Sequence, residues 1–280
     1  MRLAYNTNGL AHHRLDEALD LCAELGYGGV AITLDVAHLD PFGDWIRSAE
    51  KVRAQAASLG LTLAVETGAR FLLDPRRKHA PNLLSKDPGG RQRRIDFYKR
   101  SIEVAQALGA SVVSLWSGAA DSEERVDDGS LYDRLIEGLI PVLELARSAG
   151  VSVCFEPEPG MFIERVDQFH TLKERAQGSL ADLKMTLDVG HCLVTGEIHP
   201  DRAIRENAAE IGHVHLDDIR GGVHEHILFG EGDLDLRATL CALEEIAFAG
   251  MAAVELSRDS HRGAWAASEA MQRLMAARPN

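Results

Sequence analysis

The chain has 280 residues, of which 45% are hydrophobic, and it carries a formal net charge of −13 at pH 7. This length suffices for two small domains or for one large α/β domain, such as a barrel of roughly 250 residues. The sequence has no apolar run of the roughly 20 residues that a membrane helix requires, and its acidity disfavours contact with nucleic acid phosphates. We therefore expect no membrane or nucleic acid partner and a small molecule as the ligand.

The N-terminus, MRLAYNTNGL, has neither the apolar stretch nor the small-residue cleavage site of a secretion signal, which favours a cytoplasmic location. The cysteines are scattered and form no CxxC pair, so we expect reduced thiols rather than a disulfide framework. They are Cys22, Cys154, Cys192 and Cys241.

Short apolar strands alternate with amphipathic helices along the whole chain. The first strand is followed by apolar residues at helical spacing, a glycine ends that helix, and the unit then repeats. The expected strands cover residues 3–7, 29–34, 61–65, 111–116, 151–156, 183–188, 212–216 and 252–256. The expected helices cover residues 15–25, 45–60, 95–108, 131–149, 166–175, 202–210, 236–249 and 265–276.

This alternation of eight strands and eight helices predicts a parallel sheet covered by helices. We interpret it as a single (β/α)8 TIM barrel that forms one domain over residues 1–280, because no linker or shift in composition divides the chain. An open, doubly wound sheet is the alternative. It normally has a glycine-rich phosphate turn after the first strand, whereas NTNGLAHH does not match GxGxxG.

One connection, from Gly68 to Gly90, is much longer than the others and has no regular pattern. Loops beyond about 12 to 15 residues are usually functional or disordered, so this segment is a candidate lid. Its basic side chains are candidates for binding a substrate phosphate or carboxylate, although a solvated charge run explains them equally well. They are Arg70, Arg76, Arg77, Lys78 and His79.

Four neighbouring strands end in side chains that suit a metal ion: Glu156, Asp188, His215 and Glu255. In a (β/α)8 barrel the carboxyl ends of all strands meet on one face, where active sites form. Taken singly, such a carboxylate is as often a salt-bridge partner, but their coincidence predicts a site for one divalent cation. Oxygen and imidazole ligands without thiolate favour Mn²⁺ first, with Mg²⁺, Co²⁺ or Zn²⁺ as alternatives.

These motifs carry a family resemblance that spans nearly the whole chain. The chain resembles the xylose isomerase-like barrels, a superfamily of sugar phosphate isomerases and epimerases related to apurinic endonucleases, and is most similar in its motifs to ketose 3-epimerases. The matching residues are Glu156 in FEPE, Asp188 and His191 in DVGH, His215 in HVHLDD, and Glu255 in VELS.

The resemblance implies that the four strand-end residues bind the metal and that Glu156 and Glu255 also form the acid/base pair. It further implies that His191 and Glu158 contact substrate hydroxyls. In the epimerases an arginine after the seventh strand holds the substrate; Arg220 is the nearest equivalent, but its spacing differs by one residue.

A second departure lies in VHEHILFGEGDLD, where His224 and His226 precede a Gly-Glu-Gly turn. The endonuclease branch has a similar segment that helps to bind additional zinc ions together with the histidine of the DVGH motif. A second metal at His191, His224 and His226 is therefore one interpretation, and a loop that contacts substrate or has only a structural role is the other. Glu66 and Trp116 argue for the latter, because they stand where that branch supplies zinc-binding histidines.

The expected activity is metal-dependent isomerisation or epimerisation of a sugar or a sugar-like polyol or keto compound. A carboxylate would remove a proton beside a carbonyl through a metal-stabilised enediolate. Trp116 is a candidate for stacking on a sugar ring. Three alternatives stay open: a dehydratase or lyase acting on a keto-sugar or inosose, a multi-zinc phosphodiester hydrolase, and a sugar-binding barrel without catalysis. The sequence also leaves homo-oligomer formation open.

Overall fold

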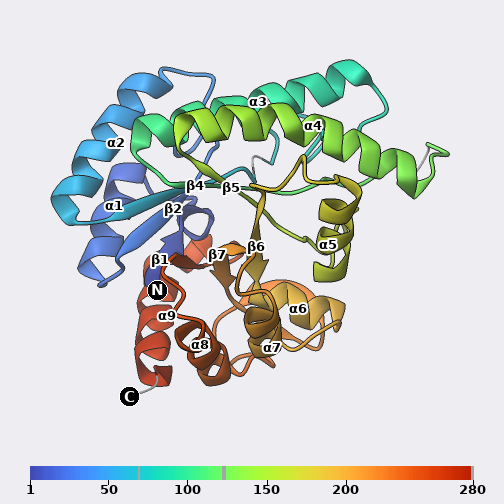
Figure 1. The fold of residues 1–280 in the computed structure, drawn as a ribbon. Coiled ribbons are helices and arrows are strands. Elements are labelled where there is room, and N and C mark those ends of the chain that lie inside the picture. The colour runs from blue at the N-terminus through green and yellow to red at the C-terminus, as the bar shows by residue number, and fades with distance from the viewer. Residues whose placement is uncertain (69, 122–123, 279–280) are drawn as a thin grey trace.

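The computed structural model describes residues 1–68, 70–121 and 124–278. Its centre is a closed barrel of parallel strands in the order β1-β10-β7-β6-β5-β4-β3-β2 (Figure 1). The (β/α)8 barrel is thereby confirmed, and the open sheet is excluded. The barrel strands are β1 (Arg2–Asn6), β2 (Gly29–Thr33), β3 (Thr62–Glu66), β4 (Val112–Leu115), β5 (Ser152–Phe155), β6 (Lys184–Asp188), β7 (Ile211–Leu216) and β10 (Met251–Val254).

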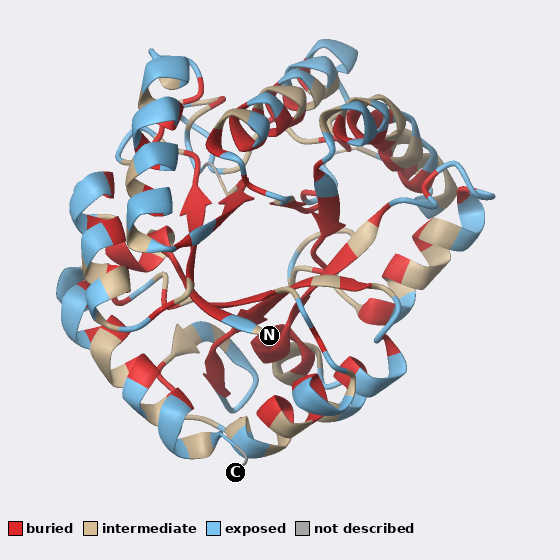
Figure 2. Cartoon of the chain, turned by 60° about the vertical axis from the view of Figure 1, so that its left-hand side comes forward, coloured by how far each residue is buried: buried red, intermediate tan, exposed pale blue. Residues whose placement is uncertain are grey.

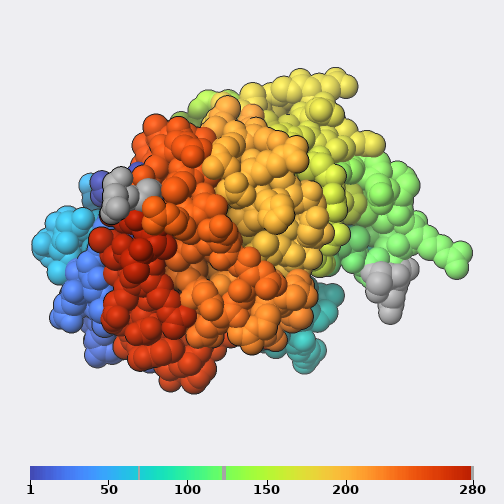
Figure 3. Space-filling view, turned by 90° about the horizontal axis from the view of Figure 1, so that it is seen from below, coloured from blue at the N-terminus to red at the C-terminus, as the bar shows by residue number. Residues whose placement is uncertain are grey.

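Helices surround the barrel and bury their apolar sides against it (Figure 2). The C-terminal helix lies beside the N-terminal segment, which closes the ring and brings the two ends of the colour scale together (Figure 3). The helices are α1 (Leu15–Glu24), α2 (Trp45–Leu59), α3 (Pro88–Leu108), α4 (Asp128–Ala149), α5 (Val166–Arg175), α6 (Val189–Thr195), α7 (Pro200–Glu206), α8 (Leu236–Glu245) and α9 (Gly263–Ala277). In the part of the chain that the structure describes, none of them is both long and apolar enough to span a membrane.

Two hydrophobic cores follow from the alternation of side chains along the strands. The larger core lies between strands and helices and contains Val30 and Ile32 of β2. A small separate cluster includes Ala31, which alternates with those two residues, together with Ala4, Ala64, Met251 and Ala253. Small side chains at these positions leave the remaining interior positions to polar groups, which form the site described below.

Two helix starts differ from the sequence prediction because local N-caps determine them, and the end of one further helix also differs. Helix α3 begins at Pro88 rather than at residue 95, since Asp87 accepts hydrogen bonds from the backbone N–H groups of Gly89 and Gly90. Helix α4 begins at Asp128, where Asp127 caps the backbone of Ser130. Helix α8 ends at Glu245, four residues early.

Two elements between the sixth strand and the eighth helix were not predicted. Helix α6 follows β6 directly, and Asp188 caps it by accepting the backbone N–H of His191. A hairpin of β8 (Asp218–Arg220) and β9 (Val223–Ile227) follows β7. Its turn residues Gly221 and Gly222 both have positive φ, as tight hairpin turns require. Helix α7 lies at 200–206 rather than at the expected 202–210.

The long connection between β3 and α3 is held in place by a buried arginine. Arg94 of α3 donates hydrogen bonds of 2.8 Å to the carbonyl oxygens of Pro81 and His79. The backbone N–H of His79 in turn bonds to the carbonyl of Arg70. Residues 70–81 of this connection are therefore held at the mouth of the barrel, where Arg70, Lys78 and His79 line a cavity; residue 69 lies outside the described residues. The cysteines are free thiols, as expected.

Candidate functional site

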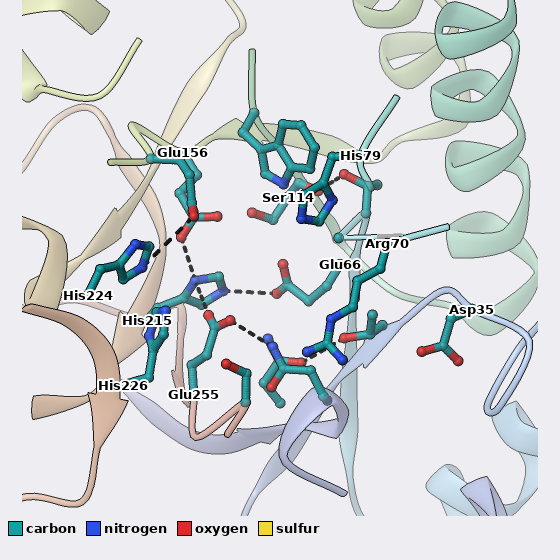
Figure 4. A pocket seen from close by; sticks show the side chains of 18 of the residues that line it. Asp35, Glu66, Arg70, His79, Ser114, Glu156, His215, His224, His226 and Glu255 are labelled. Carbon is teal, nitrogen blue, oxygen red and sulfur yellow. Dashed lines mark hydrogen bonds and ion pairs between the residues drawn. The ribbon is translucent and has the colours of Figure 1, made fainter. Parts of the chain in front are cut away.

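The four predicted metal ligands converge at the carboxyl ends of four adjacent strands. Glu156 follows β5, Asp188 ends β6, His215 lies in β7 opposite Asp188 in the strand register, and Glu255 follows β10. One ligand atom from each residue lies within 4.8 Å of those from the other three. Figure 4 shows the Glu156 and Glu255 carboxylates turned toward the ring of His215. We call these residues the four-residue ligand set.

The imidazole of His215 lies at the centre of this set. Its Nδ1 is 2.8 Å from Oε1 of Glu156, 2.9 Å from Oε2 of Glu255 and 3.9 Å from Oδ2 of Asp188. Burial lowers the pKa of His215, but the Glu156, Glu66 and Glu255 carboxylates raise it well above its ordinary value. Without a cation, a proton on this ring therefore neutralises part of the negative charge.

The chemistry of the set fits a divalent cation. Oδ1 of Asp188 caps helix α6, whereas the buried Oδ2 has no hydrogen-bond partner among the described residues. Burial, reinforced by Asp217, raises the pKa of Asp188 well above its ordinary value. A buried carboxylate oxygen without a partner is costly unless a cation compensates it. Three carboxylates and one imidazole without thiolate are ligands that Mn²⁺, Mg²⁺, Co²⁺ and Zn²⁺ accept.

A second group of side chains lies beside the first. His191 of α6 and His224 and His226 of β9 each offer a ring nitrogen within 4.8 Å of the other two, and we call them the histidine group. Nε2 of His191 lies 3.1 Å from Nε2 of His224. His191 donates from Nδ1 to the carbonyl of Pro157, which leaves its Nε2 available as an acceptor. The three residues that the sequence grouped as a possible second metal site are thus close in space.

The unpredicted hairpin brings two of these histidines to the site. The carboxylate of Asp217 lies 2.7 Å from Nδ1 of His226, and although burial lowers the pKa of His226, Asp217 raises it to about 10. Burial, followed by the charge of His226, lowers the pKa of His224 to about 4. Burial also lowers the pKa of His191 well below its ordinary value, and His226 and His224 add to this effect.

Glu156, His215 and Glu255 of the ligand set line a polar cavity of about 580 Å³, which is large enough for a monosaccharide. Glu158 and Trp116, both expected to contact substrate, line this cavity. Glu158 lies 3.7 Å from Nε2 of His191, and burial together with Glu156 and Glu255 raises its pKa well above its ordinary value. The ring of Trp116 meets that of His79 edge-on at 4.9 Å.

Arg220 does not reach this cavity. It is the exposed last residue of strand β8, and its Nε donates a 2.7 Å hydrogen bond to the carbonyl of Glu231. Arg70 and Arg258 line the cavity instead. The sequence carried a signal of this difference, since the spacing of Arg220 from the seventh-strand motif differs by one residue from that of the epimerase arginine. A one-residue shift along a strand reverses the direction of the side chain.

Two further residues at the site were not anticipated. Asn8, just after β1, donates a 2.7 Å hydrogen bond from Nδ2 to Oε1 of Glu255. Glu66, at the end of β3, contacts Nε2 of His215 at 3.1 Å. Glu66 follows the rule that identified the ligand set, since it ends a strand, whereas Asn8 lies two residues beyond the end of β1. Their partners, however, lie far away in the sequence.

Comparisons with known proteins agree with this architecture. A family model described as the xylose isomerase-like TIM barrel matches residues 19–276. Over 145 residues the chain is 26% identical to an inosose dehydratase from Geobacillus thermodenitrificans, covering 46% of this chain and 48% of that protein. The chain spans about half the length of the curated relatives it matches.

Solved structures share the fold over nearly the whole chain. A D-psicose 3-epimerase from Clostridium cellulolyticum H10 superimposes with a TM-score of 0.77 at 17% identity, covering 99% of both chains. An IOLI protein with a bound zinc atom gives a TM-score of 0.75 at 20% identity, covering 99% of this chain and 96% of that one. By its matching family model and its closed barrel, the chain belongs to the xylose isomerase-like TIM-barrel family.

Proposed function

We propose that the protein is a divalent-metal-dependent isomerase or epimerase of a sugar or a sugar-like keto compound. The observation that carries this proposal is the convergence of Glu156, Asp188, His215 and Glu255. Three of them, Glu156, His215 and Glu255, line one polar cavity. Mn²⁺ is the first choice for the cation, with Mg²⁺, Co²⁺ and Zn²⁺ as alternatives. The similarity to a psicose epimerase and to an inosose dehydratase supports a carbohydrate-like substrate.

The proposed chemistry is proton transfer at a carbon next to a carbonyl. When bound, the cation supplies a Lewis acid that lowers the energy of the enediolate formed by this step. Glu156 and Glu255 both line the cavity and approach it from different strands, so a substrate between them has a carboxylate on each side. One carboxylate takes the proton. Its return from the opposite face inverts the carbon, whereas its return to the neighbouring carbon moves the carbonyl.

Residues in the cavity and beside it have proposed roles in binding. Glu158 and His191 accept or donate hydrogen bonds to substrate hydroxyls, and Trp116 provides an apolar face for a sugar ring. The cavity is lined mainly by polar side chains, which suits a polyhydroxylated ligand better than an apolar one.

Dehydration starts from the same proton transfer and differs only in losing a hydroxyl from the neighbouring carbon. The similarity to an inosose dehydratase supports this alternative reaction.

A product analysis distinguishes dehydration from isomerisation or epimerisation. The chelator-stripped protein is reconstituted with each of the four metals and incubated with free ketoses, phosphorylated ketoses and inososes. An epimer or aldose identified by NMR supports the proposal, whereas an unsaturated or dehydrated product assigns the protein to the lyases.

A second candidate function, phosphodiester hydrolysis with several zinc ions, is favoured by the histidine group alone. If His191, His224 and His226 hold another cation, the purified chain carries more than one tightly bound zinc. The His224→Ala variant then loses one of them. A single metal per chain, retained in His224→Ala, instead leaves the histidine group as a substrate contact. Metal content measured by mass spectrometry after gel filtration decides between these two cases.

A further inference from the structure

Glu66 contacts the His215 ring from the side opposite to the other three members of the four-residue ligand set. It ends β3, and its side chain crosses the barrel interior to reach β7 (Figure 4). Its Oε1 is 3.1 Å from Nε2 of His215 and 3.0 Å from Nε2 of His213. Glu66, His213 and His215 are all buried, with exposed fractions of 5%, 0% and 1%. A buried carboxylate in this place needs an explanation, because its desolvation is costly.

The contact determines which nitrogen of His215 faces the ligand set. A neutral imidazole has one N–H donor and one acceptor nitrogen. Because an ionised carboxylate only accepts hydrogen bonds, Nε2 of His215 carries the hydrogen in this pair. Nδ1, which faces Glu156 and Glu255, then holds the lone pair that a metal ion requires.

We infer that Glu66 is a positioning residue of the proposed metal site, which holds the His215 ring so that Nδ1 points into the ligand set. This inference rests on the proposed function, since it assumes that the four-residue ligand set binds a divalent cation. Histidines that bind metals commonly donate their other N–H to a carboxylate, which fixes the ring and makes the ligand nitrogen more basic.

His213 completes this arrangement. It precedes His215 by two residues, so both rings lie on the same side of β7, and both donate to the same oxygen of Glu66. Two donors on one oxygen fix the carboxylate as well as the ring. The ionised carboxylate is the form of Glu66 that accepts both ring N–H groups.

A purely structural role makes a different prediction from a positioning role. If Glu66 only balances charge within the barrel, its replacement changes the melting temperature of the metal-free protein and leaves metal affinity and ligand geometry intact. If Glu66 holds His215, its replacement weakens metal binding and changes the coordination, even where the metal-free protein melts as before.

Glu66→Ala removes both the charge and the acceptor. Glu66→Gln keeps an oxygen acceptor and the shape but removes the charge. Ser114→Ala is the matched control, because Ser114 pairs with Glu66 in the strand register and bonds to Thr186 rather than to His215. Mn²⁺ affinity and stoichiometry are measured by calorimetry, coordination by the visible spectrum of the Co²⁺-loaded protein, and folding by melting in EDTA.

We expect Glu66→Ala to bind Mn²⁺ about 10- to 100-fold more weakly, with an altered Co²⁺ spectrum, and Glu66→Gln about three- to tenfold more weakly. Ser114→Ala should stay within about twofold of the wild type. Wild-type affinity in Glu66→Ala overturns the inference, as does wild-type affinity in Glu66→Gln if the alanine variant does not fold. A wild-type protein that binds no divalent cation overturns the proposed function, and this inference with it.

Discussion

Asn8 and Glu255 are 247 residues apart in the sequence and joined by a 2.7 Å hydrogen bond from Nδ2 of Asn8 to Oε1 of Glu255. The other oxygen of Glu255, Oε2, lies 2.9 Å from Nδ1 of His215. Asn8 therefore fixes the carboxylate so that one oxygen faces the ligand set and the other is held at the cavity. The turn that follows the first strand thereby contributes to a site built mainly from the second half of the barrel.

Replacing Asn8 by alanine should reduce the rate of proton transfer. A hydrogen bond to a charged group contributes about 1.5–3 kcal/mol, and its loss lets Glu255 rotate away from the reacting carbon. We expect kcat to fall about tenfold, which corresponds to about 1.4 kcal/mol, with KM within about twofold of the wild type. Steady-state kinetics on the substrate found in the metal-supplemented screen measure both. Ser257→Ala, a neighbouring cavity residue, is the control, and an unchanged kcat in Asn8→Ala would contradict the role.

Asp188→Asn should stabilise the metal-free protein at high pH. Because the pKa of Asp188 is raised in the folded protein, folding favours the protonated carboxyl group. This stabilising contribution is fully present below the pKa of about 3.9 that the group has in the unfolded chain, and it is lost as the pH rises through the higher pKa of the folded state. We therefore expect the amide variant to melt higher than the wild type in EDTA at pH 8, by roughly 3 °C, with a difference that shrinks toward pH 4.

Metal addition should reverse this order. A cation that binds only the folded state stabilises the folded protein. The wild type has all four proposed ligands, whereas Asp188→Asn has lost the negative charge of one of them. Saturating Mn²⁺ should therefore raise the Tm of the wild type more than that of the variant, as measured by scanning calorimetry. An equal Mn²⁺-induced shift in both proteins would show that Asp188 does not contribute to the site.

Arg70 should affect substrate binding more than catalysis. Its guanidinium points into the cavity and forms no ion pair with any residue that the structure describes (Figure 4). A bound substrate with oxygen atoms near this group gains hydrogen bonds that persist through the reaction. We expect Arg70→Ala to raise KM about tenfold while kcat stays within about twofold. Arg76→Ala, on the same connection but outside the cavity lining, should leave both unchanged. A fall in kcat alone would point to a different role.

Asp218 should be essential for the hairpin that carries His224 and His226. Its buried carboxylate accepts the backbone N–H groups of Ile219, Gly230, Gly232 and Leu234 at 2.8–3.0 Å. An amide at this position has only one acceptor oxygen, so we expect Asp218→Asn to reduce the free energy of unfolding by about 3 kcal/mol.

Urea unfolding of the Asp218 variant measures this loss, and Asp233→Asn is the matched control. Asp233 is exposed and accepts a single backbone N–H, that of Gly221. Its replacement should cost no more than about 1 kcal/mol. Equal losses in the two variants would contradict the special role of Asp218.

The barrel and the convergence of the four strand-end residues could be predicted from the sequence because both depend on local patterns. Each strand is a short apolar run, and the polar residue that ends it lies on the active face in any (β/α)8 barrel. Glu156, Asp188, His215 and Glu255 could therefore be grouped without knowledge of side-chain directions. The hairpin was missed because Gly221 and Gly222 read as an irregular loop, although two glycines between strand-like residues are a hairpin signal.

The partners of these ligands could not be predicted in the same way. Asn8 and Glu66 are polar residues just after or at the end of a strand, but nothing in the local sequence indicates that one contacts Glu255 and the other His215. Such pairings depend on the closure of the barrel and on the strand register, which fix distances across the interior. Arg220 illustrates the reverse case, because its place in the sequence suggested the cavity while the hairpin turns it toward Glu231.

Hydrogen exchange from solvent tests the central claim most directly. The Mn²⁺-loaded wild type and Glu255→Gln, with their metal contents verified to be equal, are incubated in D₂O with the panel of ketoses and inososes. We expect the wild type to incorporate deuterium next to the carbonyl of at least one compound, and Glu255→Gln to do so at least about 100-fold more slowly. Exchange at the wild-type rate in Glu255→Gln, or none in the wild type with any compound, would contradict the account.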